Sequence, residues 1–248
     1  MTPSDLRSPR PPRSARPTAG PPEVRRLPLL AICLGYFLVI LDVTVVTVAV
    51  PRIAADLGAG HGVLQWVVDG YTLAFAGLLL LCGGLGDRLG HRRVFLAGLG
   101  VFTAASAGCA LAPTAAVLVG ARLAQGAGAA MMVPASLALL GELHPEPAAR
   151  ARAFGVWGGI AGSAAAAGPV LGGLLVWGVD WRAVFFLNIP VGVFAVVLTR
   201  RRVPAPKVSG GPGAPAARRG GPALRRRRGR RPDGRAQRGG GRGWATRW

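Results

Sequence analysis

The stretch GGLGDRLGHRR, residues 83–93, decides how the rest of the chain is arranged. It is small and charged, and it separates two apolar runs, 62–82 and 94–112. Each run is long enough to cross a hydrocarbon core of roughly 30 Å as a helix. We therefore expect the stretch to form a loop at a membrane face. Its three arginines lie close to both helix ends, where basic residues favour the cytoplasmic side.

The composition divides the 248-residue chain into parts of different chemistry. The chain is 51% hydrophobic yet has a formal net charge of +20, a combination that a single globular domain rarely shows. Residues 27–202 hold nearly all the apolar material, whereas residues 1–26 and 203–248 are rich in Arg, Pro and Gly. These terminal segments cannot bury enough apolar surface to offset their ordering entropy. We therefore expect a membrane domain flanked by two disordered basic tails.

Six apolar segments follow one another within the membrane domain, and they predict an all-α membrane protein with six transmembrane helices. They are 27–50, 62–82, 94–112, 114–140, 153–177 and 183–199. The connections on one side of the membrane carry most of the arginine, which leaves only Arg52 and Arg182 on the other side. This positive-inside bias predicts that both termini are cytoplasmic. We expect a multi-pass protein of the cell inner (cytoplasmic) membrane.

Three ionisable side chains fall well inside these spans: Asp42, Asp69 and Arg122. Such a group costs about 2.5 to 3.5 kcal/mol at a span centre, so each is a candidate functional residue. A helical rise of about 1.5 Å per residue places all three at similar depth in the outer half of the membrane. We predict that Arg122 faces Asp42 with Asp69 nearby, an arrangement suited to proton coupling. The alternatives are a purely structural pairing for Asp42 and Arg122 and a position that reaches water for Asp69.

Small residues cluster within the spans, most densely at 126–130 and 168–173. Small residues let helices approach closely in lipid, although coding by GC-rich DNA also supplies Gly and Ala. Pro169 removes a backbone donor in the second cluster and clashes with the preceding turn. This cluster therefore predicts a kinked, closely packed helix, with an inert kink as the alternative.

No residue pattern points to an enzyme. Cys33, Cys82 and Cys109 all lie in apolar runs without the spacing of a disulfide framework or a zinc site. The sequence contains no nucleotide-binding loop, catalytic triad or metal constellation. We therefore expect no catalytic residues, no cofactor and no metal.

The stretch that begins at Gly83 resembles the G-x-L-a-D-r-x-G-r-k segment between spans two and three of the major facilitator superfamily. The residues in register are Gly83, Leu85, Asp87, Arg88, Gly90 and Arg92. His91 stands where Arg or Lys is usual. Four further segments resemble motifs of one subfamily, the fourteen-span drug:proton antiporters of bacteria.

Each of these segments keeps the order and spacing of its motif. Residues 41–51 are similar to the span-one motif, with Thr47 in place of the usual Asn. The span-four motif is matched by Leu118, Arg122, Gln125, Gly126, Gly128, Ala129 and Ala130. The antiporter motif of span five is matched by Gly155, Gly168, Pro169, Gly172 and Gly173, with Ala164 where a glycine is expected. Residues 181–190 resemble the start of span six.

The resemblance covers residues 27–202 and implies the N-terminal half of a major facilitator fold. It implies export of small hydrophobic or cationic drugs in exchange for protons, with Asp42 and Arg122 in coupling. It also implies that Asp87, Arg88 and Arg92 act in conformational gating.

Transporters of this superfamily consist of two six-span halves with the substrate between them. The partner of this chain is therefore expected to be a missing C-terminal half, or a second copy in a homodimer. We expect a truncated exporter whose residues 203–248 are read out of frame, and a non-functional fragment is the alternative. A basic tail that binds anionic lipid or nucleic acid through residues 225–231 is a rival that we do not favour, because aromatic residues do not interleave the charges.

Overall fold

The computed structural model describes residues 26–204, and within this range six helices follow one another without a strand. Their bounds are α1 Arg26–Leu57, α2 His61–Leu89, α3 His91–Ala110, α4 Ala115–Leu143, α5 Pro147–Gly178 and α6 Arg182–Arg202. All six are long and apolar enough to cross a membrane. The predicted all-α fold with six spans is confirmed. Of the predicted tails, 1–26 and 203–248, residues 1–25 and 205–248 lie outside the described residues.

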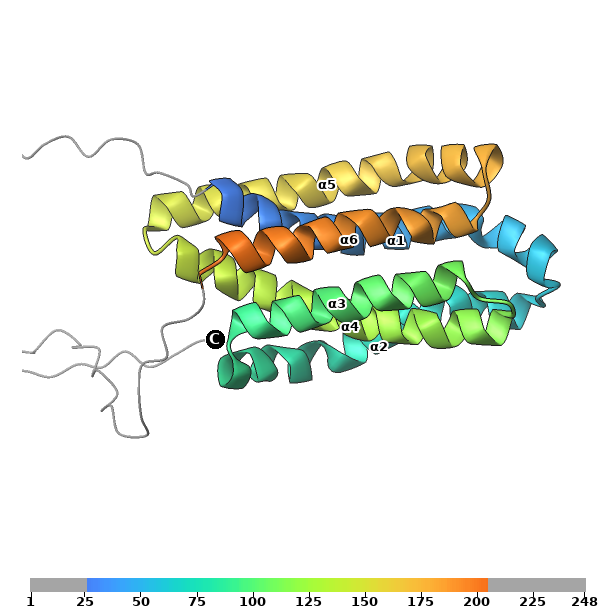
Figure 1. Cartoon of the computed structure of the whole chain (residues 1–248), viewed down its shortest axis with the longest axis horizontal. Coiled ribbons are helices and arrows are strands. Elements are labelled where there is room, and N and C mark those ends of the chain that lie inside the picture. The colour runs from blue at the N-terminus through green and yellow to red at the C-terminus, as the bar shows by residue number, and fades with distance from the viewer. Residues whose placement is uncertain (1–25, 205–248) are drawn as a thin grey trace, which may run out of the picture. The chain divides into compact units, whose positions relative to one another are not determined.

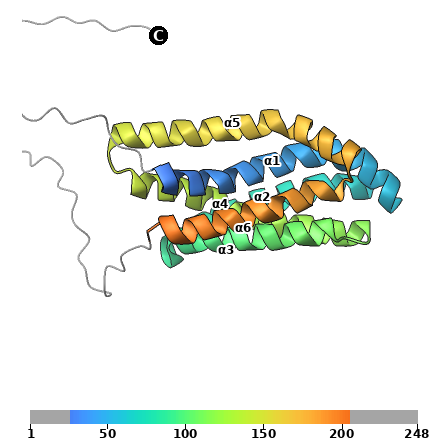
Figure 2. The same ribbon diagram turned by 45° about the horizontal axis from the view of Figure 1, so that its top comes forward.

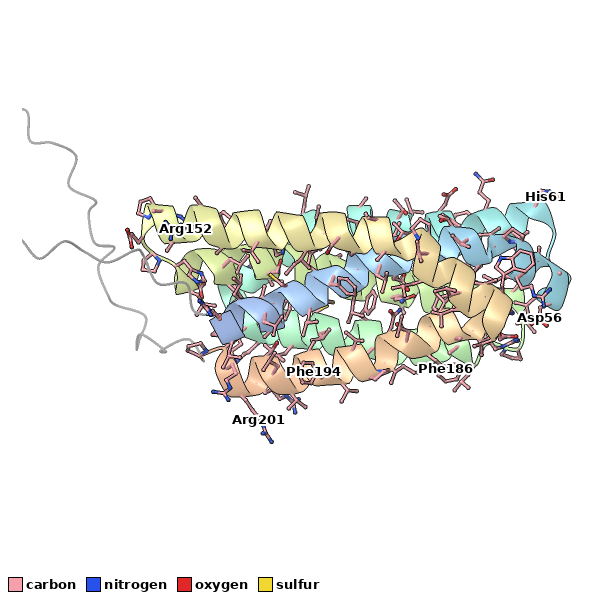
Figure 3. The ribbon with its side chains drawn as sticks, turned by 90° about the horizontal axis from the view of Figure 1, so that it is seen from above. Asp56, His61, Arg152, Phe186, Phe194 and Arg201 are labelled. Carbon is pink, nitrogen blue, oxygen red and sulfur yellow. The ribbon has the colours of Figure 1, made fainter. Side chains whose placement is uncertain are left out.

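Successive helices run in opposite directions, so their junctions gather at two ends of the bundle (Figure 1). One end holds the start of α1, the end of α6 and two of the junctions, and we call it the arginine end. Figure 3 shows Arg152 and Arg201 at this end and Asp56 and His61 at the other, which we call the opposite end. The arginines of the described helices are therefore distributed as the sequence predicts.

The helices pack as two related groups of three. α1 packs mainly against α5 and α6, and α4 packs mainly against α2 and α3, while α3 also contacts α6. Figure 1 shows these groups as neighbouring layers, and Figure 2 shows α6 beside α3, where the two groups meet. Exchanging α1–α3 with α4–α6 reproduces the same set of contacts, which is the pattern of a three-plus-three repeat. α1 and α4 are the central helices, and α2 and α5 are the outer ones.

Residues 83–93 do not form the predicted loop. α2 continues to Leu89 and α3 begins at His91, so only Gly90 lies outside a helix. Gly90 has φ 89°, a backbone conformation that residues with a Cβ rarely adopt, and its N–H donates to the carbonyl of Gly86 at 2.9 Å. Glycine therefore lets the chain reverse within a single residue.

The buried apolar side chains form two clusters along the bundle axis. The cluster towards the arginine end includes Phe95, Leu99 and Phe102 of α3. The cluster towards the opposite end includes Trp181 and Phe185, with residues from the second half of α1. Along α3, α4 and α6 the two clusters are separated by a short segment of each helix, and on α1 they meet close to Asp42. Buried polar side chains occupy this intervening layer.

Candidate functional site

Five buried polar side chains make up the layer between the two apolar clusters, and we call it the polar layer. They are Asp42 of α1, Ser106 of α3, Arg122 and Gln125 of α4, and Asn188 of α6. None of these residues is more than 1% exposed. Because polar groups at this depth are stable only when they are hydrogen-bonded, the arrangement of their partners decides what the layer can do.

The carboxylate of Asp42 lies at the centre of the polar layer and accepts hydrogen bonds at both oxygens. Arg122 Nη1 donates to Oδ2 and forms a buried ion pair with it. Gln125 Nε2 donates to Oδ1 at 2.7 Å, and Asn188 Nδ2 donates to the same oxygen at 2.9 Å. The pairing of Asp42 with Arg122 expected from their depths is therefore present. Three donors from two other helices surround one charged acceptor.

The guanidinium of Arg122 has partners besides Asp42. Its Nε donates to the carbonyl of Val67 at 3.0 Å, and its Nη1 donates to Gln125 Oε1 at 2.8 Å. The guanidinium also lies 4.4 Å from the ring centroid of Tyr71, in a cation–π contact. Val67 and Tyr71 bring α2 into the site. Arg122 therefore keeps favourable contacts in a state where Asp42 carries no charge.

Ser106 fixes the orientation of the two amides in the polar layer. Its hydroxyl accepts from Gln125 Nε2 at 2.9 Å and from Asn188 Nδ2 at 3.4 Å, and it donates to the carbonyl of Phe102 at 2.9 Å. Ser106, Asn188 and Tyr71 belong to the site although the sequence did not predict them as site residues. An amide within an apolar span was the available signal for Asn188, whereas nothing local distinguishes Ser106.

Asp69 lies outside the polar layer. It sits on α2 with an exposed side chain, and it takes part in none of the hydrogen bonds or ion pairs found among residues 26–204. Asp69 was expected near Asp42 because both lie at similar depth in their spans. The two side chains are nevertheless apart, because Asp42 faces the interior of the bundle and Asp69 faces outward. A coupling role for Asp69 stays a prediction.

The predicted gating segment, at the junction of α2 and α3, contacts two further helices at the arginine end. His91 Nε2 lies 3.6 Å from Asp87 Oδ1 on α2 and 3.5 Å from Glu142 Oε1 on α4. Arg92 Nη2 donates to the carbonyl of Arg200 at the end of α6, at 2.9 Å. The junction of α2 and α3 is therefore connected to both α4 and α6.

The other predicted residues of the gating segment have different surroundings. Arg88 is exposed in the last turn of α2, and Gly83 is half-buried with open space around it. Gly86 was not selected, yet a Cβ at this position would lie 2.5 Å from His91 Nδ1. The absence of a side chain at Gly86 therefore leaves room for the imidazole of His91.

Two glycines of the span-four motif bring α4 into backbone contact with its neighbours. A Cβ at Gly126 would meet the carbonyl oxygen of Tyr71 on α2. A Cβ at Gly128 would lie 2.7 Å from the backbone nitrogen of Phe102 on α3. Close approach at these positions places Arg122 and Gln125 within reach of the neighbouring helices.

Only part of the antiporter motif on α5 makes close contacts. A Cβ at Gly168 would collide with the side chain of Thr44 on α1, and one at Gly172 would lie 3.1 Å from Val45 Cγ1. Pro169 is exposed, and a Cβ at Gly155 or Gly173 would meet nothing within 4 Å. The predicted close packing of this helix is therefore present on the face towards α1, next to Asp42.

A six-helix membrane bundle with a buried ion pair between its central helices has the construction of a transporter domain, because ionisable groups inside spans mark transport pathways. Residues 32–239 match the Major Facilitator Superfamily, and the chain belongs to this superfamily. It is thus a multi-pass membrane protein of a transporter family and not an enzyme.

Curated relatives match between 68% and 72% of the chain. The chain is 46% identical over 177 residues to the methylenomycin A resistance protein of Streptomyces coelicolor, covering 71% of this chain and 37% of that protein. It is 46% identical over 169 residues to the tetracenomycin C resistance and export protein of Streptomyces glaucescens, covering 68% and 31%. It is 44% identical over 179 residues to the cephamycin export protein of Amycolatopsis lactamdurans, covering 72% and 37%. The matched region thus spans between 31% and 37% of the length of these relatives.

Proposed function

We propose that residues 27–202 form the N-terminal half of a proton-coupled drug exporter of the cell inner membrane. One observation carries this proposal: a single carboxylate, Asp42, is buried between the central helices and paired with a cation that has other partners in reach. The relatives are named for resistance to, or export of, methylenomycin A, tetracenomycin C and cephamycin. We infer that this chain also acts on a drug, and from its resemblance to drug:proton antiporters we infer a small hydrophobic or cationic drug-like substrate.

Proton binding at Asp42 is the step that couples transport to the proton gradient in this proposal. A proton on the carboxylate removes the charge that attracts Arg122 and so weakens the connection between α1 and α4. Arg122 stays a cation throughout, because its guanidinium is not deprotonated in proteins. It remains held by the carbonyl of Val67, by Gln125 Oε1 and by the ring of Tyr71. The two central helices can then move relative to one another without leaving a buried charge unsolvated.

The remaining predicted residues have supporting roles in this proposal. The arginine end faces the cytoplasm, in line with the positive-inside distribution. There Gly83, Asp87, Arg88, Gly90 and Arg92 gate the movement of the bundle, supported by the contact of Arg92 with α6.

Two further groups of residues complete the proposal. Asp69 serves as a second proton-coupling carboxylate on α2, supported by its depth within the span. Gly168 and Gly172 keep α5 tightly against the helix that carries Asp42.

The proposal includes a second six-span half, because the substrate of such transporters lies between two halves that move about it. We infer either further spans of a longer protein or a second copy of this chain. The outer helices could meet this partner, since Leu80 of α2 and Trp177 of α5 are 88% and 85% exposed.

A chimera tests the proposed function in the presence of a complete second half. Residues 27–202 replace the corresponding segment of the methylenomycin A resistance protein of S. coelicolor, and the chimera is produced in a drug-sensitive host. We expect resistance together with drug-driven proton movement in inverted membrane vesicles. The Asp42→Asn chimera should lose both, because it cannot cycle between charged and neutral forms.

The controls separate loss of function from loss of protein. A Cβ at Gly158 meets nothing within 4 Å, so the chimera that carries Gly158→Ala should give the same resistance and proton movement as the unmodified chimera. Membrane levels of all variants are compared by a fluorescent tag. Full proton-coupled export by the Asp42→Asn chimera would refute the proposal. Export by the 248-residue chain alone would favour the homodimer.

A further inference from the structure

The start of α6 contacts α1 at two separate places. Near the opposite end, Trp181 Nε1 donates to Asp56 Oδ2 at 3.0 Å, and Arg182 Nη1 donates to the same oxygen at 2.7 Å. The Arg182 guanidinium also lies 4.3 Å from the Trp181 ring centroid. About two helical turns further along α6, Asn188 reaches Asp42. The first contact holds the start of α6 against the last turns of α1, and the second brings α6 to the polar layer.

Asn188 depends on Asp42 for its principal hydrogen bond. The residue is 1% exposed, and its Nδ2 donates to Asp42 Oδ1 at 2.9 Å. The other acceptor within reach, Ser106 Oγ, lies at 3.4 Å and already accepts from Gln125. A buried amide in an apolar span is costly without an acceptor, so this contact is the reason such a residue is tolerated here.

The distribution of donors makes the two oxygens of Asp42 unequal. A carboxylate oxygen has two lone-pair sites. Both sites of Oδ1 are used by the amides of Gln125 and Asn188, whereas Arg122 is the donor to Oδ2. Oδ2 therefore has the remaining lone pair, and an incoming proton adds there.

We propose that Asn188 is a positioning residue for the proton site, an inference that rests on the proposed function. Its amide stabilises the ionised carboxylate and directs the proton to Oδ2, while Arg122 supplies the opposing charge. Because Asn188 is on α6, the charge state of Asp42 also controls how strongly α6 is held to α1. Loss of the negative charge weakens the Asn188 bond along with the ion pair.

Infrared spectroscopy of the full 248-residue chain in lipid bilayers tests this inference. The C=O stretch of a protonated carboxyl is followed as the pH is lowered, and Asp42→Asn identifies the band that belongs to Asp42. Asn188→Leu removes the amide donor, so the ionised form becomes less favourable. We expect the pH of half-maximal band amplitude to rise by about one to two pH units, the effect of one hydrogen bond to a charged group.

Two further variants distinguish the loss of the Asn188 amide from a general loss of structure. Asn188→Ser removes the amide without adding bulk and should move the transition in the same direction. Ser136→Ala removes a buried hydroxyl that donates to the carbonyl of Val133, away from the polar layer, and should leave the transition unchanged. Circular dichroism and size-exclusion chromatography verify that each variant is folded.

The possible outcomes distinguish this inference from the function on which it rests. If the wild-type chain has an Asp42 band whose transition is unmoved in both folded Asn188 variants, the positioning role is refuted and the proposed function stands. If no Asp42 band appears in the wild-type chain at any accessible pH, the proposed function and the inference both fail.

Discussion

The central helices α1 and α4 differ clearly from the outer helices α2 and α5 in burial but not in length, and α4 is no more apolar than α2 or α5. The four helices have 32, 29, 29 and 32 residues in the order α1, α2, α4 and α5, and all are apolar enough to span a membrane. Most of the apolar part of α1 and α4 is buried within the bundle, whereas most of that of α2 and α5 faces outward. Apolar content therefore identifies a span without indicating its place in the bundle.

Paired charge is what distinguishes the central helices. Asp42 lies on α1 and Arg122 on α4, and their contact requires other helices to enclose both of them. An unpaired charge facing lipid is costly, so a matched acid and base mark the helices at the centre. Asp69 is an exception to this rule, because it is an acidic residue within an outer helix, α2, and its side chain is exposed. Comparing substitutions in the central helices with matched substitutions in the outer helices tests this difference.

The largest effect is expected from breaking the central ion pair. Arg122→Met leaves the Asp42 carboxylate buried without its counter-ion, which should lower the free energy of unfolding by about 3 to 5 kcal/mol. SDS titration in mixed micelles measures this change. Thermal unfolding can be followed with a thiol-reactive fluorophore, because Cys33, Cys82 and Cys109 are all buried and free.

A double-mutant cycle shows whether the loss comes from the pair itself. Asp42→Leu combined with Arg122→Met removes both charges, so the loss should be smaller than the sum of the two single losses. Additive losses would mean that the two side chains stabilise the bundle independently, contrary to the ion pair at its centre.

A smaller loss is expected from filling the close approach of α4 to α2. In Gly126→Ala the new Cβ meets the carbonyl oxygen of Tyr71, so the helices must move apart at a cost of about 1 to 3 kcal/mol. The matched change is Gly158→Ala on α5, where nothing lies within 4 Å. The control should keep or raise the melting temperature, because alanine favours the helix by about 0.5 to 1 kcal/mol over glycine. Equal losses at both positions would remove the distinction between central and outer helices.

Much of this fold follows from the sequence because membrane spans are set by simple physical limits. A span needs about twenty apolar residues, and arginine near its ends indicates its direction, so the six helices and their alternation were predictable. The ends of the helices were harder to predict, since α2 continues well beyond its apolar run to Leu89. The backbone of residues 83–88 stays helical in spite of its glycines and charges, and the reversal is made by Gly90 alone.

The candidate site was predictable only in its charged members. Depth along a helix follows from the rise per residue, and it was enough to pair Asp42 with Arg122. Depth gives no information about rotation around the helix axis, which is why Asp69 was expected beside them and lies on the exposed surface instead. Ser106 is identified only by the packing of α3 against α4, whereas the amide of Asn188 within an apolar span is visible in the sequence and only its contact with Asp42 needs the fold.

The smallest effect on stability is expected at Asp69, the carboxyl that lies on an outer helix. Asp69→Asn removes a charge that has no ion-pair partner among residues 26–204, so the melting temperature should stay within error of the wild-type value. The same chemical change at Asp42 should lower it clearly, because Arg122 loses its counter-ion there. The two variants are compared in the same detergent with the thiol-reactive fluorophore. A large loss in Asp69→Asn would show that the carboxylate is paired within a complete assembly, since an isolated exposed charge contributes too little to explain it.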